Sequence, residues 1–154
     1  MLRQRGLLLM PLRIEPATPA DVPEVEALLS ASGLPLEGAA EALRCGVVAR
    51  DEGRIVAAAA VERFGDAGLL RSVVVDRARR GTGLGRQMVA AAEQLAQAEG
   101  VHDLYLLTET AADWFPRLGY EVVERPVAAA AVGGSIEFTT VCRDTGVPMR
   151  RVLA

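Results

Sequence analysis

A short segment rich in glycine, residues 80–85, separates an apolar run over residues 69–75 from a helix-like stretch over residues 87–99. Glycine has no Cβ and tolerates positive φ, so the segment can turn sharply between a strand and a helix. The amides of the turn and of the first helical turn then point to one spot, where the helix dipole adds a partial positive charge. The segment therefore predicts a strand–turn–helix unit that binds a pyrophosphate; the alternative is a tight turn that binds no ligand.

The spacing of the glycines excludes two common phosphate-binding motifs. A Walker loop has lysine and then serine or threonine after its last glycine, whereas Arg86 and Gln87 follow Gly85 here. A dinucleotide-binding fingerprint has the spacing G-x-G-x-x-G, whereas Gly81, Gly83 and Gly85 give G-x-G-x-G. The predicted pyrophosphate therefore belongs to another class of cofactor.

Composition narrows the functional classes. The 154 residues suffice for one domain, and a 51% hydrophobic fraction with 24% charged residues is typical of a globular protein. A net charge of −3 gives no indication of nucleic-acid binding. No apolar run reaches the length of a membrane span. All 17 basic residues are arginine, which excludes Schiff-base chemistry, and one histidine with two cysteines predicts no metal site. So few cysteines favour a reducing, cytoplasmic compartment.

Hydrophobic periodicity and turn residues predict an α/β domain over residues 11–154, after an N-terminal extension over residues 1–10 that we expect to be disordered. Helices are expected over residues 18–32, 36–44, 84–99 and 111–118, while residues 128–131 fit either a helix or a loop. Strands are expected over residues 12–15, 45–50, 55–61, 69–75, 104–107, 120–124 and 147–153, with turns at residues 51–53 and 65–68. The strand over residues 55–61 is almost wholly apolar, which predicts burial on both faces.

The glycine-rich segment matches a longer pattern, [Arg/Gln]-x-x-Gly-x-[Gly/Ala], through Arg80, Gly83 and Gly85, with the strand end at residues 74–76 before it. This pattern resembles the acyl-CoA signature of the GCN5-related N-acetyltransferase (GNAT) family, as does the predicted order of elements. The resemblance implies a mixed central β-sheet of six to seven strands flanked by about four helices. It also implies that the strand before the glycine-rich segment and the strand after its helix splay apart, with the thioester of acyl-CoA in the gap.

A second segment, residues 108–120, resembles the family motif Asn-x-x-Ala-x-x-Phe-Tyr-x-x-Leu-Gly-Phe, with two departures. Thr108 stands at the asparagine position, so its hydroxyl must replace an amide in a catalytic role. Phe115 stands at the position of a tyrosine that in the family protonates the departing thiolate, and phenylalanine has no such proton to donate. Phe115 is therefore predicted to pack in the core, to cover the pantetheine arm of the cofactor, or to do both.

The resemblance implies direct transfer of an acetyl group from acetyl-CoA to the amine of a small molecule, without a metal. The backbone N–H near Val73, at a bulge in the central strand, is expected to stabilise the oxyanion, as preorganised donors do in other acyl transfers. Glu62 is the first candidate for the base that accepts the ammonium proton, with Glu109 and Glu37 as alternatives. The cofactor is expected to contact Val73, Val74, Val75, Arg80, Gly81, Thr82, Gly83, Leu84, Gly85, Arg86 and Phe115.

Arg71 places a charge in the middle of the apolar run over residues 69–75. Because a buried charge is costly, this side chain should be paired or should face a cavity. It is predicted either to make a forked contact to an anionic group of the acceptor or to form an ion pair with Glu62 or Asp66 across a hairpin. On the first interpretation, the acceptor-binding residues are Arg71, Ser72 and Glu109.

Residues 32–38, 69–75 and 105–108, together with a tail over residues 137–149, are similar to a narrower group, the arsenic-resistance-associated branch of the family. In that branch phenylalanine at the position of Phe115 looks usual. The resemblance implies a bacterial enzyme whose acceptor is an amino-acid-like compound, with arsenic or phosphorus as candidate elements in it.

A second functional class stays open, a non-catalytic acyl-CoA-binding sensor or partner module on the same fold. Phe115 favours this class. The polar residues Arg71, Ser72 and Thr108 favour an enzyme, because a protein that only binds acyl-CoA needs no polar site for a second substrate. Members of the family are often dimers, and the last strand, over residues 147–153, is the segment expected to mediate a homodimer here.

Overall fold

A computed structural model describes residues 12–136, 138 and 146–153. The extension predicted for residues 1–10 and most of the tail over residues 137–149 lie outside the described residues.

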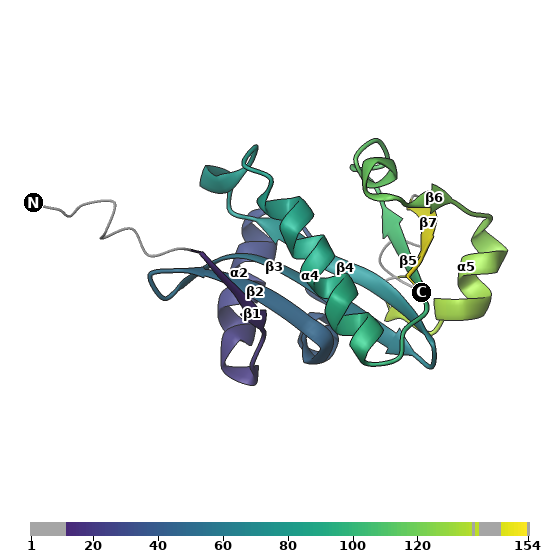
Figure 1. Ribbon diagram of the computed structural model, residues 1–154, viewed down its shortest axis with the longest axis horizontal. Helices are drawn as coiled ribbons and strands as arrows, with labels where there is room; N and C mark the ends of the chain where they lie inside the picture. Colours follow the sequence, from purple (N-terminus) through teal and green to yellow (C-terminus); the bar gives the residue numbers. More distant parts are fainter. Residues whose placement is uncertain (1–11, 137, 139–145, 154) are drawn as a thin grey trace, which may run out of the picture.

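The described chain folds into one seven-stranded mixed sheet with helices on both faces (Figure 1). The strand order is β1-β2-β3-β4-β5-β7-β6, and every neighbouring pair is antiparallel except β4 and β5. The strands are β1 Arg13–Pro16, β2 Gly46–Asp51, β3 Arg54–Phe64, β4 Ala67–Val75, β5 Asp103–Thr108, β6 Glu121–Val122 and β7 Val147–Val152. The α-helices are α2 Val22–Ala31, α3 Ala39–Ala42, α4 Leu84–Ala98 and α5 Arg125–Val132, and the 3₁₀ turns are η1 Pro19–Asp21, η2 Leu43–Cys45, η3 Arg77–Arg79 and η4 Phe115–Leu118.

The core lies on both faces of β3, as its apolar sequence predicts. Residues 55–61 are all buried, and they divide between a cluster under α4 and a cluster under α2 and α3. Four consecutive alanines, residues 57–60, give this strand small side chains, so helices can approach it from either side. A third cluster packs α5 against β4 and β5.

Strands β4 and β5 separate after three paired positions. The parallel pairing runs from Ala67 opposite Asp103 to Leu69 opposite Tyr105, and β4 then continues to Val75 without a partner on that side. The divergence can be followed in Figure 1, where β5 leaves the direction of β4 beside α4. The predicted splay is therefore present, and it leaves the edge of β4 over residues 70–75 open.

A β-bulge interrupts the other edge of β4. Ala60 pairs with Arg71 and Ala58 pairs with Val74, so two residues of β4 lie opposite Ala59. Ser72, within this bulge, has a φ of 58°, which is uncommon for a residue with a side chain. Such a bulge re-aims the backbone groups around it, as predicted near Val73.

Several predicted elements are shorter than expected, among them the strand predicted over residues 120–124, of which only β6 forms. The helix predicted over residues 36–44 begins only after Gly38, whose φ of 79° is left-handed, and continues as the 3₁₀ turn η2. The helix predicted over residues 111–118 is only η4, because Pro116 has no N–H for an α-helical hydrogen bond. The turn predicted over residues 65–68 is two residues long, since Phe64 already pairs with Ala67.

The last strand, which was predicted to mediate a homodimer, lies inside the described sheet. β7 lies between β5 and β6 and pairs with both, so the outer edges of the sheet are β1 and β6. Within the described residues, no helix is long and apolar enough to cross a membrane.

Candidate active site

A cavity of about 960 Å³ opens where β4 and β5 diverge. Its wall comes from the loop after α2, from β4, from the glycine-rich segment, from the end of β5 and from the segment around η4. Most of the sequence-predicted site residues line it, namely Arg71, Ser72, Val73, Val75, Arg80, Gly81, Gly83, Leu84, Gly85, Arg86, Thr108, Glu109 and Phe115.

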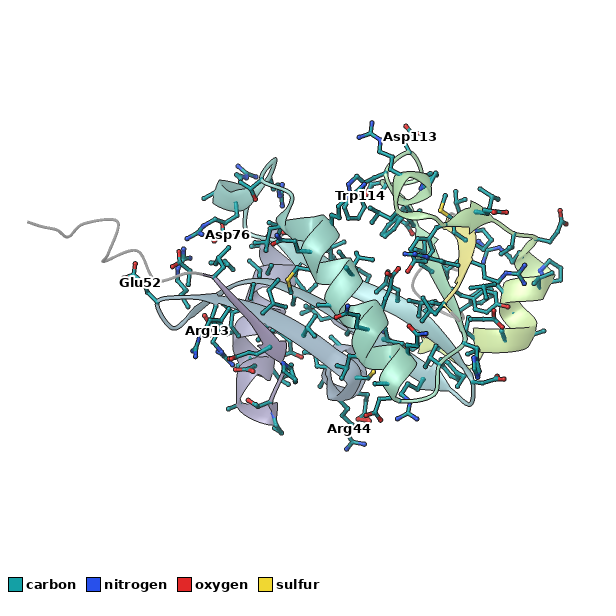
Figure 2. The ribbon with its side chains drawn as sticks, viewed as in Figure 1. Arg13, Arg44, Glu52, Asp76, Asp113 and Trp114 are labelled. Atoms are coloured by element: carbon teal, nitrogen blue, oxygen red, sulfur yellow. The ribbon has the colours of Figure 1, made fainter. Side chains whose placement is uncertain are left out.

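The glycine-rich segment forms one end of the cavity. Gly81 and Gly83 have φ values of 80° and 85°, and Gly83 caps the N-terminus of α4 in the left-handed conformation. Gly85 lies close to Trp114, because a Cβ at this position would lie 3.3 Å from the ring. Figure 2 shows Trp114 in the space between the N-terminal end of α4 and the segment around η4. The amides of this helix end therefore face the cavity beside an aromatic ring.

Arg80 connects the glycine-rich segment by hydrogen bonds to the end of β4 and to the loop after α2. Its Nε donates to the carbonyl oxygen of Val75 at 3.2 Å, and its Nη2 donates to Oγ of Ser32 at 3.2 Å. Ser32 follows α2 and also lines the cavity. Thr82 does not line the cavity, because its hydroxyl donates to the carbonyl oxygen of Arg79 at 2.6 Å.

The residues of the bulge lie along one side of the cavity. The side chains of Val73 and Val75 line it, whereas Val74 is buried in the cluster under α2 and α3. Any contact of Val74 with a cofactor is therefore limited to its backbone. The sheet register gives neither Ser72 nor Val73 a partner on β3.

Arg71 forms the ion pair predicted as its second role. Its side chain is 0% exposed, and its Nη1 lies 3.5 Å from Oε1 of Glu62. Nη2 donates to the carbonyl oxygen of Glu37, and Gly38 follows with no room for a side chain, since a Cβ there would lie 2.8 Å from Nη1 of Arg71. Asp66, the other candidate, forms no ion pair with Arg71 in the described part of the chain; its carbonyl oxygen accepts from the amides of His102 and Asp103 at the start of β5. With its side chain fully buried, Arg71 has no side-chain atom exposed for direct contact with an acceptor in this conformation.

The structure does not bring Glu62 or the Glu37 side chain to the cavity wall. Glu62 accepts a hydrogen bond from Oγ of Ser135 at 2.7 Å and faces Arg71. Among the described residues, Glu109 is the acid in the wall. Beside it, Oγ1 of Thr108 accepts from the amide of Ala111 at 2.9 Å, so the hydroxyl fixes the turn after β5.

Phe115 stands in a row of aromatic rings. Its ring meets Trp114 edge to face at 4.9 Å between centroids, and Tyr120 at 5.7 Å. Tyr120 donates from its hydroxyl to Glu93 of α4 at 2.8 Å, and Arg151 of β7 pairs with the same carboxylate at 2.9 Å. Burial, together with the Glu93 carboxylate, raises the pKa of Tyr120 well above its ordinary value, so the hydroxyl stays protonated. Phe115 thus both packs in the core and lines the cavity.

Several parts of the wall were not identified as site residues from the sequence, among them residues 32–35, Arg79 and Arg117. Residues 32–35 lie in a segment that is similar to the arsenic-resistance-associated branch, but no site role was predicted for them. No site role was predicted for Arg79 or Arg117 either. The only local signal is charge, because Arg117 lies in the second motif and Arg79 directly precedes the first.

A comparison with protein families identifies the chain. The family model described as "Acetyltransferase (GNAT) domain" matches residues 43–122, which is just over half of the chain. The chain belongs to the GNAT acetyltransferase family. The matched residues run from η2 to β6 and include the bulge, the glycine-rich segment and the aromatic row.

Curated relatives of this GNAT domain are longer proteins. An amino-acid acetyltransferase of Pseudomonas fluorescens is 38% identical over 88 residues, which are 54% of this chain and 20% of that protein. Mouse N-alpha-acetyltransferase 80 is 36% identical over 80 residues, which are 52% of this chain and 25% of that protein. The chain thus spans a quarter or less of the length of these two relatives.

The GNAT fold is also found in solved structures. N-acetylglutamate synthase from Neisseria gonorrhoeae, solved with coenzyme A and N-acetyl-glutamate, superposes with a TM-score of 0.78 at 19% identity, over 94% of this chain and 36% of that one. This likeness confirms the predicted fold class. Within the described residues, no group of three or more histidine, cysteine or acidic side chains could hold a metal ion.

Proposed function

We propose that this GNAT domain transfers an acetyl group from acetyl-CoA to the amine of a small molecule by direct attack. One observation carries the proposal: the open edge of β4, the bulge at Ser72 and the left-handed turn at Gly83 all face the same cavity. A strand edge offers amides and carbonyls in a row, and the glycine-rich turn offers amides at the end of that row.

We propose that the cofactor lies along the whole length of this cavity. The pyrophosphate occupies the turn at Gly81 and Gly83, and the pantetheine arm pairs with the backbone of β4 in the manner of an added strand. The thioester then lies at the bulge, where the N–H of Val73 donates to its carbonyl oxygen. As negative charge develops on that oxygen, the donor stabilises the transition state, an effect of about 2.7–4 kcal/mol in other acyl transfers.

The transfer proceeds in one complex. The neutral amine attacks the thioester carbon, the tetrahedral intermediate collapses, and coenzyme A leaves as a thiolate while the new amide forms. Glu109, at the cavity wall, replaces Glu62 as the proposed base that accepts the ammonium proton, directly or through water. Thr108 holds the turn that carries it. The leaving thiolate takes its proton from water, because Phe115 has none to give.

An acyl-enzyme route finds no thiol in the described part of the cavity wall. Cys45 is a buried residue of the cluster under α4, and burial raises the pKa of its thiol. A neutral thiol in the core is a poor nucleophile, which supports direct attack.

We infer that the acceptor is amino-acid-like. The Pseudomonas relative acts on amino acids by its name, and the Neisseria structure contains N-acetyl-glutamate. The three segments that are similar to the arsenic-resistance-associated branch meet at one cavity, through residues 32–35, 70–73, 75 and 106–108. From this resemblance we infer a bacterial, cytoplasmic enzyme of that branch, with an acceptor that contains arsenic or phosphorus.

A sensor remains the second candidate, and Phe115 is the observation that favours it. A panel of amines separates the two: acetyl-CoA is incubated with the protein and with amino acids, their arsenic and phosphorus analogues, polyamines or N-terminal peptides. We expect thiol release with a small amino-acid-like acceptor and a product heavier by one acetyl group in the mass spectrum. Tight binding of acetyl-CoA with no acetylated product from any amine would establish the sensor instead.

A further inference from the structure

The cavity is positively charged although the protein is acidic. The whole chain has a formal net charge of −3, but among the described residues the cavity wall holds one acid, Glu109, and five arginines. These arginines are Arg71, Arg79, Arg80, Arg86 and Arg117. A cleft that concentrates one sign of charge attracts a ligand of the opposite sign, here a polyanion.

Three of the five arginines already have structural partners. Arg71 is fully buried against Glu62, and Arg79 forms an ion pair with Asp51 of β2. Arg80 is bound to the carbonyl oxygen of Val75 and to Ser32. These side chains shape the wall, and their positive charge is partly neutralised or fixed in place.

Arg86 and Arg117 differ from Arg71 and Arg79, which pair with carboxylates, and from Arg80, whose guanidinium makes two hydrogen bonds within the protein. Both are exposed, and within the described part of the chain neither pairs with a carboxylate. Arg86 stands in the first turn of α4, and its Nη2 lies 3.5 Å from the carbonyl oxygen of Arg117 in η4. Two arginines without a carboxylate partner among the described residues therefore lie at the rim, and the guanidinium of Arg86 reaches the backbone of Arg117.

We propose that Arg86 and Arg117 form a subsite for the 3′-phosphate of coenzyme A. This inference rests on the proposed function, in which the turn at Gly81 and Gly83 holds the pyrophosphate. The adenosine lies beyond the pyrophosphate on the side away from the thioester, so its ribose reaches the rim between α4 and η4. A phosphate monoester carries close to two negative charges at neutral pH and accepts forked contacts from arginine. The protein therefore distinguishes coenzyme A thioesters from their 3′-dephospho counterparts.

The test compares two ligands that differ only in this phosphate. Calorimetry gives the dissociation constants of acetyl-CoA and 3′-dephospho-acetyl-CoA for the wild type, for Arg86→Gln, for Arg117→Gln and for the double variant. We expect the wild type to bind acetyl-CoA roughly ten-fold to a hundred-fold more tightly, as one or two charge-assisted contacts imply. Each single substitution lowers this preference several-fold, and the double variant binds both ligands alike. Affinity for the dephospho ligand stays unchanged throughout.

Arg44→Gln is the matched control. It removes one positive charge from an exposed arginine, and Figure 2 shows Arg44 on the far side of the molecule from Trp114. We expect it to keep the wild-type preference. Melting curves confirm that each variant is folded.

Two results would overturn the subsite. A double variant that retains the wild-type preference would show that other groups recognise the 3′-phosphate. An equal loss of affinity for both ligands would assign the two arginines to the pyrophosphate. Failure of the wild type to bind either ligand is a different result, because it removes the proposed function and this subsite with it.

Discussion

Gly83 is the residue on which cofactor binding depends most directly. Its φ of 85° is left-handed, and a Cβ there would meet nothing within 4 Å, so the effect of a side chain is on the backbone alone. Gly83→Val should abolish acetyl-CoA binding while leaving the fold largely intact, because the strained turn moves the amides that face the pyrophosphate. Titration calorimetry measures the loss, and unchanged affinity would remove the glycine-rich segment from the site.

Gly53 supplies a control for that experiment. It has a φ of 82°, also has open space around its Cβ position, and lies in the β2–β3 hairpin outside the cavity wall. Gly53→Val should cost a similar strain of about 1–2 kcal/mol in stability and leave acetyl-CoA affinity as it is.

The substitution Phe115→Tyr tests whether the lack of a tyrosine hydroxyl at this position limits kcat. The ring packs edge to face against Trp114 and Tyr120, so a hydroxyl at its tip is the only change in Phe115→Tyr. If water protonates the thiolate, kcat should be nearly unchanged in steady-state assays. A large gain in kcat would instead mark the native site as impaired and would support the sensor.

Arg71 of β4 connects the sheet to the loop after α2. It binds the carbonyl oxygen of Glu37 and faces Glu62, and lysine cannot reproduce both contacts with one ammonium group. Arg71→Lys should lower the unfolding free energy by about 1.5–3 kcal/mol. It should also raise KM for the acceptor and leave KM for acetyl-CoA unchanged, because Arg71 holds the carbonyl oxygen of Glu37 in the loop whose residues 32–35 line the cavity, where we propose that the acceptor binds. Kinetics with each substrate varied in turn, beside a denaturant titration, measure both effects. An unchanged acceptor KM would confine Arg71 to a purely structural role.

At the scale of elements, the start of α2 is joined to the sheet by a buried ion pair. The carboxylate of Asp21 accepts from Arg50 of β2 at 2.7 and 2.8 Å and from the amide of Thr18 at 2.8 Å. Burial by itself raises the pKa of Asp21, but these hydrogen bonds outweigh it and lower the pKa below its ordinary value. A carboxyl with a lowered folded pKa stabilises the protein above the unfolded pKa of about 3.9, and that contribution is lost as pH falls through the folded value.

Asp21→Asn should therefore lower the unfolding free energy at neutral pH by about 1.5–3 kcal/mol. The difference from the wild type should shrink as pH falls below about 4, where the native carboxyl also becomes protonated. Urea titrations from neutral to acid pH measure this convergence. Glu41→Gln, on an exposed position of α3, is the control and should change little. A difference that stayed constant with pH would assign the effect to packing.

Local sequence predicted most elements but not all of their lengths. The turn at Asp51, Glu52 and Gly53 and the glycine-rich segment depend on local conformation, so they could be located from sequence. β3 is longer than the predicted strand over residues 55–61, because its polar end pairs with β4 in the hairpin. Pro116 restricts the helix predicted over residues 111–118 to a 3₁₀ turn. The proline is a local signal in the sequence, but the prediction gave more weight to the spacing of the apolar residues.

At the scale of the whole molecule, the cavity exists because β4 and β5 part after Leu69 and Tyr105. The family resemblance implied this gap, but no local pattern shows which side chains reach it. Glu62 and Arg71 are only nine residues apart in sequence, but their ion pair depends on how the β3–β4 hairpin and the loop at Glu37 pack together. The same packing leaves Glu62 outside the cavity wall. Long-range packing also brings Arg86 next to Arg117, 31 residues away.

The central claim is that acetyl-CoA and an amine react directly within this one cavity. Initial rates of thiol release, with the concentrations of acetyl-CoA and of the best acceptor both varied, test it most directly. Direct transfer requires both substrates to be bound together, so double-reciprocal plots should give intersecting lines, with no thiol released in the absence of acceptor. Parallel lines, or a burst of thiol before acceptor is added, would show an acyl-enzyme and contradict the account.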